Sequence, residues 1–175
     1  MSAIAGYFDL NKQLPKETLV TMMSAVYSVE GVRQCFQESW GGLGVVSQAS
    51  DGECYFEFDD SKIGVVGEFE KSPKTVASLR LDQMTETEIA ALRGGFIWAK
   101  MDEAQQRFFI VNDHFGRHPL YIVKYKEAVL FATQIKVLLA ALPVKPELDQ
   151  QAVAMMLSIG EMVGNQTLVS GITTL

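Results

Sequence analysis

Side chains that could perform acid–base or metal chemistry are few in this chain. The two histidines, His114 and His118, closely follow Asp113, and a carboxylate beside imidazoles is typical of sites that transfer protons. Gly116 and Pro119 lie in the same short stretch, however, and residues of these types mark a turn. We therefore predict that Asp113 accepts backbone N–H bonds and that both histidines are ordinary loop side chains.

The two cysteines, Cys35 and Cys54, are far apart in the sequence and form no CxxC pair. A zinc site needs cysteines and histidines at ligand spacing, and disulfides belong to oxidising compartments. We therefore expect two buried free thiols, and we predict no metal site.

Length and composition are those of an ordinary single domain. The chain has 175 residues and a formal net charge of −6, and a domain of this size buries roughly 70% of its extended-chain surface. Because basic residues are scattered, we expect no nucleic-acid partner. No apolar run reaches the roughly 18 residues of a membrane span, and the start lacks the features of a signal peptide. We expect one cytoplasmic domain over residues 1–175 that does not bind membranes.

The first half of the chain reads as strands with helices between and after them. Apolar runs bounded by turn sequences predict strands at residues 3–10, 43–46, 53–58 and 63–69. After the first strand, Pro15 and apolar residues at helical spacing predict a helix that ends near residue 28. A polar surface connection at 71–85 and a short helix at 86–92 complete this half.

The second half carries a strand, a turn and a hairpin. We predict a strand at 108–111, the turn that contains Asp113, and adjacent antiparallel strands at 120–123 and 129–132. Thr133 is a good N-cap residue for the amphipathic helix that follows. Many strands with helices at both ends of the sequence indicate an α+β layered fold.

Two sequence stretches in this half carry a resemblance to a known family. Residues 112–121 read NDHFGRHPLY and residues 130–140 read LFATQIKVLLA. They resemble the Asp-x-Phe-Gly-x-x-Pro-Leu-Tyr and Leu-Phe-Ala-x-x-Ile-Lys-x-Leu-Leu patterns of the N-terminal glutaminase domain of asparagine synthetase-type amidotransferases. The similarity extends over residues 94–175, which is too long for a chance match of a short motif.

The resemblance implies a fold and a catalytic mechanism. The fold is the four-layer αββα sandwich of antiparallel sheets found in N-terminal-nucleophile (Ntn) hydrolases, with the first strand central. In that family a cysteine at the second position attacks the glutamine amide and its own α-amino group serves as base, while an Asn-Gly pair stabilises the oxyanion. Here Ser2 occupies the nucleophile position, and Val66 and Gly67 occupy the oxyanion position. A valine side chain offers no donor.

The residues that hold glutamine in the resembled family have no clear counterparts here. An arginine and an aspartate bind the substrate's α-carboxylate and α-amino groups in that family. Arg33 lies in no copy of the arginine motif, and Asp82 lies in the right interval without the aspartate motif. The substrate-binding residues therefore stay unknown.

Two functions of different classes follow. In the first, the chain is an inactive glutaminase domain that is retained as a structural and interaction domain. Its partner is an ATP-dependent synthetase domain beyond residue 175, and ATP and magnesium would bind there rather than in this domain. β-Lactam synthetases, whose amine comes from the substrate itself, show that members of the superfamily can dispense with ammonia from glutamine. In the second, the chain is an active amidohydrolase that uses Ser2 on glutamine or another amide.

The end of the chain predicts an interaction surface. Residues 148–175 hold three methionines and many aliphatic residues but two acidic and no basic side chains. We expect this segment to contact the synthetase domain and, without it, to form a homodimer. Within it, Met155, Met156 and Leu157 are interpreted as helix packing, with an adaptable peptide-binding surface as the alternative. Trp40 and Trp98 are interpreted as core or interface aromatics.

Overall fold

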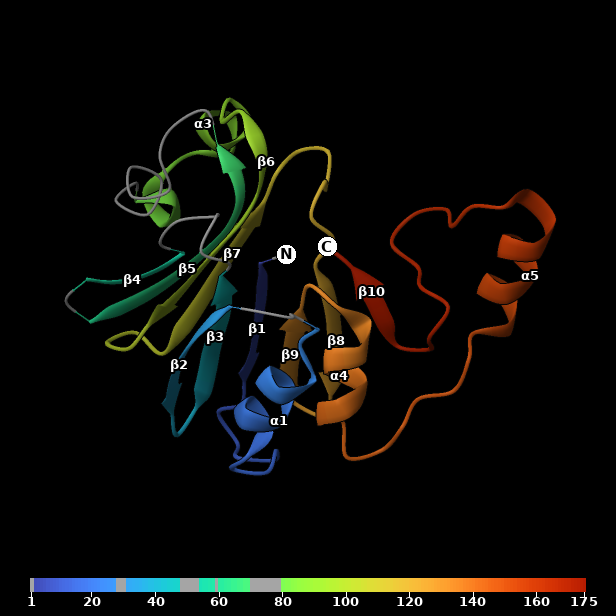
Figure 1. Cartoon of the computed structure of the whole chain (residues 1–175), viewed down its shortest axis with the longest axis horizontal. Coiled ribbons are helices and arrows are strands. Elements are labelled where there is room, and N and C mark those ends of the chain that lie inside the picture. The colour runs from blue at the N-terminus through green and yellow to red at the C-terminus, as the bar shows by residue number, and fades with distance from the viewer. Residues whose placement is uncertain (1, 28–30, 48–53, 59, 70–79) are drawn as a thin grey trace.

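The structure is a computed structural model that describes residues 2–27, 31–47, 54–58, 60–69 and 80–175. Within these residues, two antiparallel sheets of six and four strands form a layered sandwich (Figure 1). The α+β fold of layered antiparallel sheets predicted from the sequence is confirmed.

The strands of the larger sheet are β1 (Ala3–Phe8), β2 (Val32–Glu38), β3 (Gly41–Ser47), β8 (Tyr121–Tyr125), β9 (Ala128–Ala132) and β10 (Ile172–Thr174). The strands of the smaller sheet are β4 (Tyr55–Phe58), β5 (Ser61–Phe69), β6 (Gly94–Asp102) and β7 (Arg107–Asn112). The helices among the described residues are α1 (Thr18–Ala25), the 3₁₀ helix η2 (Leu81–Gln83), α3 (Glu86–Ala90), α4 (Ile135–Ala141) and α5 (Gln150–Ile159).

The first strand lies inside the larger sheet. The order of that sheet is β10-β8-β9-β1-β3-β2, and the order of the smaller sheet is β4-β5-β6-β7. Ala5 of β1 lies opposite Gly44 of β3 on one side and opposite Ala132 of β9 on the other. The central first strand and the hairpin of β8 and β9 agree with the sequence prediction.

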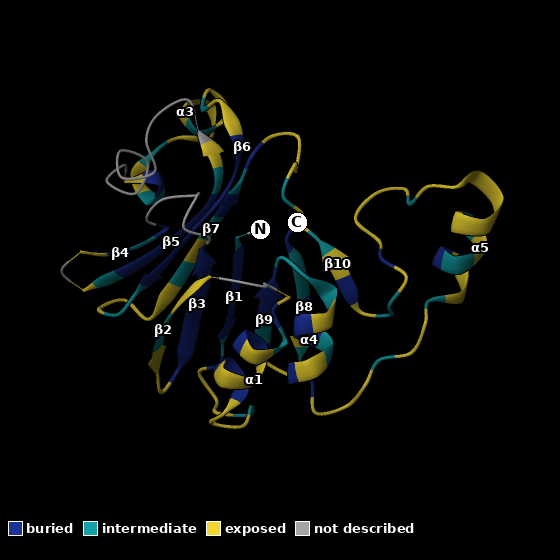
Figure 2. Ribbon diagram, in the orientation of Figure 1, coloured by how far each residue is buried: buried dark blue, intermediate teal, exposed yellow. Residues whose placement is uncertain are grey.

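Three apolar layers hold the sandwich together. Helices α1 and α4 cover the outer face of the larger sheet, the two sheets share the middle layer, and η2 and α3 cover the outer face of the smaller sheet. Figure 2 shows the buried residues gathered along the strands of both sheets. Trp40 and Trp98 are both buried within these layers, so their interpretation as core aromatics is confirmed.

Three strands were not predicted: β2, β6 and the short strand β10. The edge strand β2 escaped notice because most of its residues are exposed and it lacks a continuous apolar run. Strand β6 starts with two glycines and contains a lysine, yet it is buried along almost its whole length. Lys100 can be buried there because its ammonium group pairs with Asp82 of η2 at 2.9 Å.

Thr133 does not cap α4, contrary to the prediction. The N-cap of α4 is Gln134, and it makes no side-chain capping bond. Since β9 pairs with β1, Thr133 lies beside Ile4 instead: its backbone N–H donates to the Ile4 carbonyl at 2.9 Å. Its hydroxyl also contacts the Ile4 N–H and carbonyl, each at 3.3 Å. Thr133 therefore fixes the start of β1.

Two expectations about burial are wrong in part. Cys54 is buried but Cys35 is exposed, because it lies on the edge strand β2. Helix α5 stands away from the sandwich (Figure 1), and Met156 and Leu157 are exposed rather than packed. Within α5, Ala152 alone is buried.

Candidate functional site

The candidate site lies at the start of β1. Ser2 directly precedes this strand and is half-buried. Side chains alternate along a strand: Ala3 and Ala5 belong to the layer under α1 and α4, whereas Ile4 belongs to the layer between the sheets. By this alternation, position 2 falls on the side that faces the smaller sheet.

Val66 lies on β5 and faces the same layer. It is only 2% exposed and lies in one apolar cluster with Ile4 and with Ile97, its partner on β6. Burying an aliphatic side chain of this size contributes about 1.5–3 kcal/mol to stability. At this position the side chain strengthens the core and offers no hydrogen bond to a substrate.

Gly67 has a backbone conformation that other residues rarely adopt. Its φ is +116°, and it lies opposite Phe96 on β6. A Cβ atom at this position would come within 2.1 Å of the Gly95 carbonyl oxygen. Only glycine fits here without moving the backbone of β6. The bend of the chain at the predicted oxyanion position is thus built into the sheet.

The turn after β7 is held next to this bend by Asp113, which is buried. Its carboxylate accepts N–H bonds from Phe96 at 3.1 Å, from Phe115 at 3.1 Å and from Arg117 at 3.2 and 3.3 Å. The prediction that Asp113 is a turn residue is confirmed. His114 belongs to the same turn, where its ring contacts the Phe115 ring edge-on.

Neither Arg33 nor Asp82, which match no substrate-binding motif in the sequence, belongs to the candidate site. Arg33 lies on the edge strand β2 opposite Val46, which in turn lies opposite Ala3. Because residues opposite one another share a face, Arg33 falls on the side of α1 and α4, away from the layer between the sheets. Asp82 forms the ion pair with Lys100 on the outer face of the smaller sheet.

Arg117, which no motif in the sequence marks as a site residue, has a side chain that lies over Gly95. A Cβ atom on Gly95 would meet the Arg117 Cδ at 2.7 Å, and Gly95 lies opposite Glu68, the residue after Gly67. A cationic side chain therefore lies close to the bend of β5. The glycine pair at the start of β6, which leaves room for it, is the sequence signal that could have found it.

The described residues contain no group of three His, Cys, Asp or Glu side chains that could hold a metal ion. In the same part of the chain, no helix has the length and apolar character to cross a membrane.

Comparison with known families agrees with the described geometry. A family model for the glutamine amidotransferase domain matches residues 74–175, more than half of the chain. The chain belongs to the glutamine amidotransferase domain family. No curated protein matches it significantly.

The extent of the matched region limits what the family match says about glutamine hydrolysis. It includes the turn at Asp113, the hairpin of β8 and β9, and helices α4 and α5. It begins after Ser2, Val66 and Gly67, the three positions where the nucleophile and the oxyanion donors are expected. Membership of the family therefore does not by itself assign glutamine hydrolysis to this member.

Proposed function

We propose that this chain is the amidotransferase-like domain of an asparagine synthetase-related, ATP-dependent amide-forming enzyme, and that it does not hydrolyse glutamine. The observation that carries the proposal is Val66. Its side chain occupies the expected oxyanion position and is part of the apolar layer between the sheets. Loss of one oxyanion donor typically lowers turnover about 10²–10³-fold. Position 2 also holds serine in place of the more nucleophilic cysteine. The loss of the cysteine and the loss of the oxyanion donor both slow the attack on the glutamine amide.

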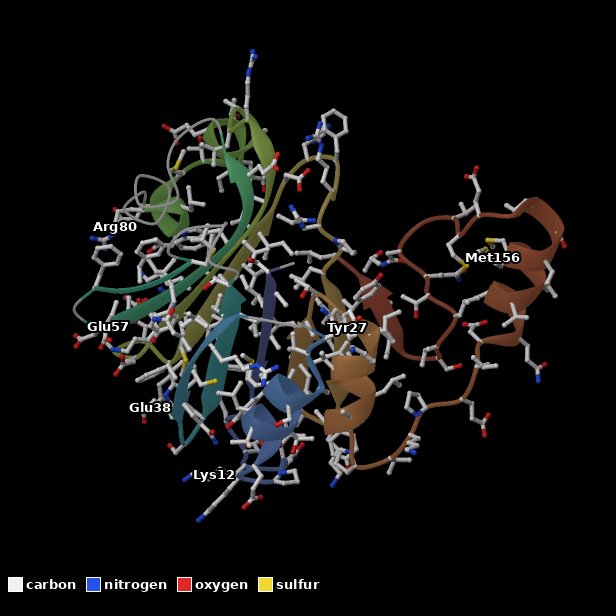
Figure 3. The ribbon with its side chains drawn as sticks, viewed as in Figure 1. Lys12, Tyr27, Glu38, Glu57, Arg80 and Met156 are labelled. Atoms are coloured by element: carbon white, nitrogen blue, oxygen red, sulfur yellow. The ribbon has the colours of Figure 1, made fainter. Side chains whose placement is uncertain are left out.

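In this proposal the domain keeps its Ntn-type sandwich in order to contact a synthetase domain, which would bind ATP and magnesium. Helix α5 and the segments beside it supply the contact surface. They expose a set of large apolar side chains: Leu148, Met156, Leu157, Ile159 and Val163. Figure 3 shows Met156 on the helix that projects from the sandwich. Exposed apolar patches of this kind usually mark interaction surfaces.

Ammonia release from glutamine tests the catalytic part of the proposal. We expect the wild type and Ser2→Ala to give the same background rate. Ser2→Cys should stay near that rate as well, because Val66 still supplies no donor. A Ser2-dependent turnover within the ordinary range of about 1–10³ s⁻¹ would contradict the proposal.

The alternative function, an amidohydrolase with Ser2 as nucleophile, is favoured by one feature. Gly67 forms a bend in β5, and the Arg117 side chain lies close to it, so a cation is present near the expected substrate. The two functions differ in the effect of Arg117→Gln on any amide hydrolysis. If hydrolysis occurs and depends on both Ser2 and Arg117, the alternative is correct.

Sedimentation velocity over a range of concentrations tests the contact surface. In the absence of a synthetase domain we expect the wild type to form a homodimer through α5. Met156→Glu and Leu157→Glu should weaken the dimer, whereas Val144→Glu, an exposed position before α5, should not. A wild type that stays monomeric at all concentrations, or a dimer that survives both α5 changes, would rule out this surface.

A further inference from the structure

A pocket of about 590 Å³ lies at the end of β1 that is remote from Ser2. It is lined by Tyr7 near the end of the strand, by residues of the following turn, and by the end of β2. Figure 3 shows Lys12 and Glu38, two of its lining residues, at this end of the molecule. Its volume falls within the range of about 300–1,000 Å³ that is typical of small-molecule sites.

Asp9 is the unusual residue of this pocket. It is only 3% exposed. One carboxylate oxygen, Oδ2, accepts the backbone N–H of Leu14 at 2.7 Å and so holds the turn closed. The other, Oδ1, is buried and has no hydrogen-bond partner. A buried carboxylate oxygen without a partner is unfavourable for folding, and native structures rarely keep one without a use.

Tyr7 and Gln37 add a positioned hydroxyl to the pocket. The Gln37 side-chain amide donates to the Tyr7 hydroxyl at 3.0 Å and to the Lys16 carbonyl at 2.8 Å. Because the Tyr7 oxygen accepts this bond, its own proton is left to donate to a ligand. Burial raises the pKa of Tyr7, partly offset by the Gln37 bond, and Asp9 raises it further. The hydroxyl therefore stays protonated, as a donor must.

The charges that line the pocket are balanced. Asp9 and Glu38 supply two carboxylates, and Lys12 and Lys16 supply two ammonium groups. Asp9 is buried, whereas Lys12, Lys16 and Glu38 are exposed, so the outer end carries a net positive charge. A ligand that complements these charges carries a positive group at its inner end, next to Asp9, and a negative group at its outer end, next to the lysines. Leu14 and Pro15 add an apolar wall.

We propose that this pocket binds a free α-amino acid with an uncharged side chain. Its ammonium group donates to Asp9 Oδ1, and its carboxylate accepts from the Tyr7 hydroxyl and from Lys12 or Lys16. Its side chain lies against Leu14 and Pro15. The pocket is separate from the Ser2 end of β1 and takes part in no catalytic step, so it acts as a binding site only.

Isothermal titration calorimetry of the full chain with the twenty L-amino acids tests this proposal. We expect at least one amino acid with an uncharged side chain to bind with a Kd below about 1 mM. Its N-acetyl derivative, which lacks the ammonium group, and its methyl ester, which lacks the carboxylate, should each bind at least about tenfold more weakly, as expected when a charged hydrogen bond is lost.

Variants locate the site. Asp9→Asn should weaken binding at least about tenfold, and Asp60→Asn, which changes an exposed carboxylate elsewhere, should leave it unchanged. Tyr7→Phe keeps the ring and provides a second test if Asp9→Asn fails to fold.

The proposal is overturned if no amino acid binds at 10 mM, a concentration about tenfold above the expected limit. It is also overturned if the N-acetyl derivative binds as well as the parent, or if Asp9→Asn and Tyr7→Phe both bind like the wild type. A negative result would leave the proposed function untouched, because that function involves other residues.

Discussion

The two ends of β1 differ in what lies beside them. At the Ser2 end, the expected oxyanion position holds Val66, which is buried in an apolar cluster. At the other end, Asp9 keeps a buried carboxylate oxygen without a partner beside a pocket. A buried aliphatic side chain adds stability, whereas an unsatisfied buried oxygen lowers it. Under our two proposals, the Ser2 end has lost its polar site and the Asp9 end binds the ligand.

The surroundings of β1 can differ between its two ends because the neighbouring strands hold β1 in place whether or not either end forms a binding site. β1 pairs with β3 along its whole length and with β9 over residues 5–8. Thr133 adds the contacts at Ile4. Variants at each end of β1 test how far the two ends are independent.

Gly67→Ala should destabilise the protein by about 3 kcal/mol or more, because the new Cβ would overlap the backbone of Gly95. The control is Gly160→Ala, since Gly160 also has a positive φ, of +78°, but open space around it. That change should cost only about 1–2 kcal/mol. Urea unfolding measures both. Equal effects would show that the bend at the Ser2 end is not constrained by β6.

The two buried aspartates should respond differently to loss of charge. Asp113→Asn should lower the free energy of unfolding by about 2–3 kcal/mol, because an amide N–H₂ would face a backbone N–H that the carboxylate now accepts. Asp9→Asn should change it by less than about 0.5 kcal/mol, since its amide oxygen can still accept the Leu14 N–H. Urea unfolding of both variants at one pH is the measurement. A large loss for Asp9→Asn would mean that Asp9 serves folding rather than binding.

Val66→Asn should cost about 1–3 kcal/mol, because it places an amide in the apolar layer between the sheets. Val66→Ala is the control for lost volume alone. The measurement is again urea unfolding, together with ammonia release. If Val66→Asn is as stable as the wild type, its amide has found polar partners and the Ser2 end is still built as a polar site.

At the pocket end, Tyr7 should titrate above the ordinary range of a tyrosine. Its pKa is raised above the ordinary 10.0, mainly by burial. The folded state therefore disfavours the tyrosinate, and the stabilisation is complete below about pH 10 and is lost as the pH rises through the folded-state pKa. Ultraviolet titration of the wild type against Tyr7→Phe isolates this group. Asp9→Asn should lower the Tyr7 pKa slightly, and an unchanged value would separate the two residues.

The sequence predicted well those elements whose pattern is local. Apolar runs bounded by turn residues located β1, β5 and the hairpin of β8 and β9, and the glycine and proline near Asp113 identified its turn. The sequence prediction failed for residues whose role depends on contacts with distant parts of the chain. Strand β2 is exposed because it lies at a sheet edge, and Thr133 bonds to Ile4, a residue far away in the chain.

The residues near the two ends of β1 also have surroundings that the local sequence does not reveal. Ser2 and Val66 could be named because they align with a family motif, but the burial of Val66 between the sheets depends on the pairing of distant strands. Asp9 was read as part of a strand predicted at residues 3–10. An aspartate two residues before an Asn-Lys turn was the available signal, but the unpartnered oxygen can be identified only when β2 and the turn close around it.

The most direct measurement of whether the Ser2 end has lost its chemistry is covalent capture. The protein is incubated with a glutamine analogue in which an electrophilic diazoketone replaces the amide, and its intact mass is then recorded. We expect the mass of the wild type to stay unchanged, as that of Ser2→Ala should. A stoichiometric adduct that maps to Ser2 and is absent from Ser2→Ala would show a functional nucleophile and contradict the proposed loss of activity.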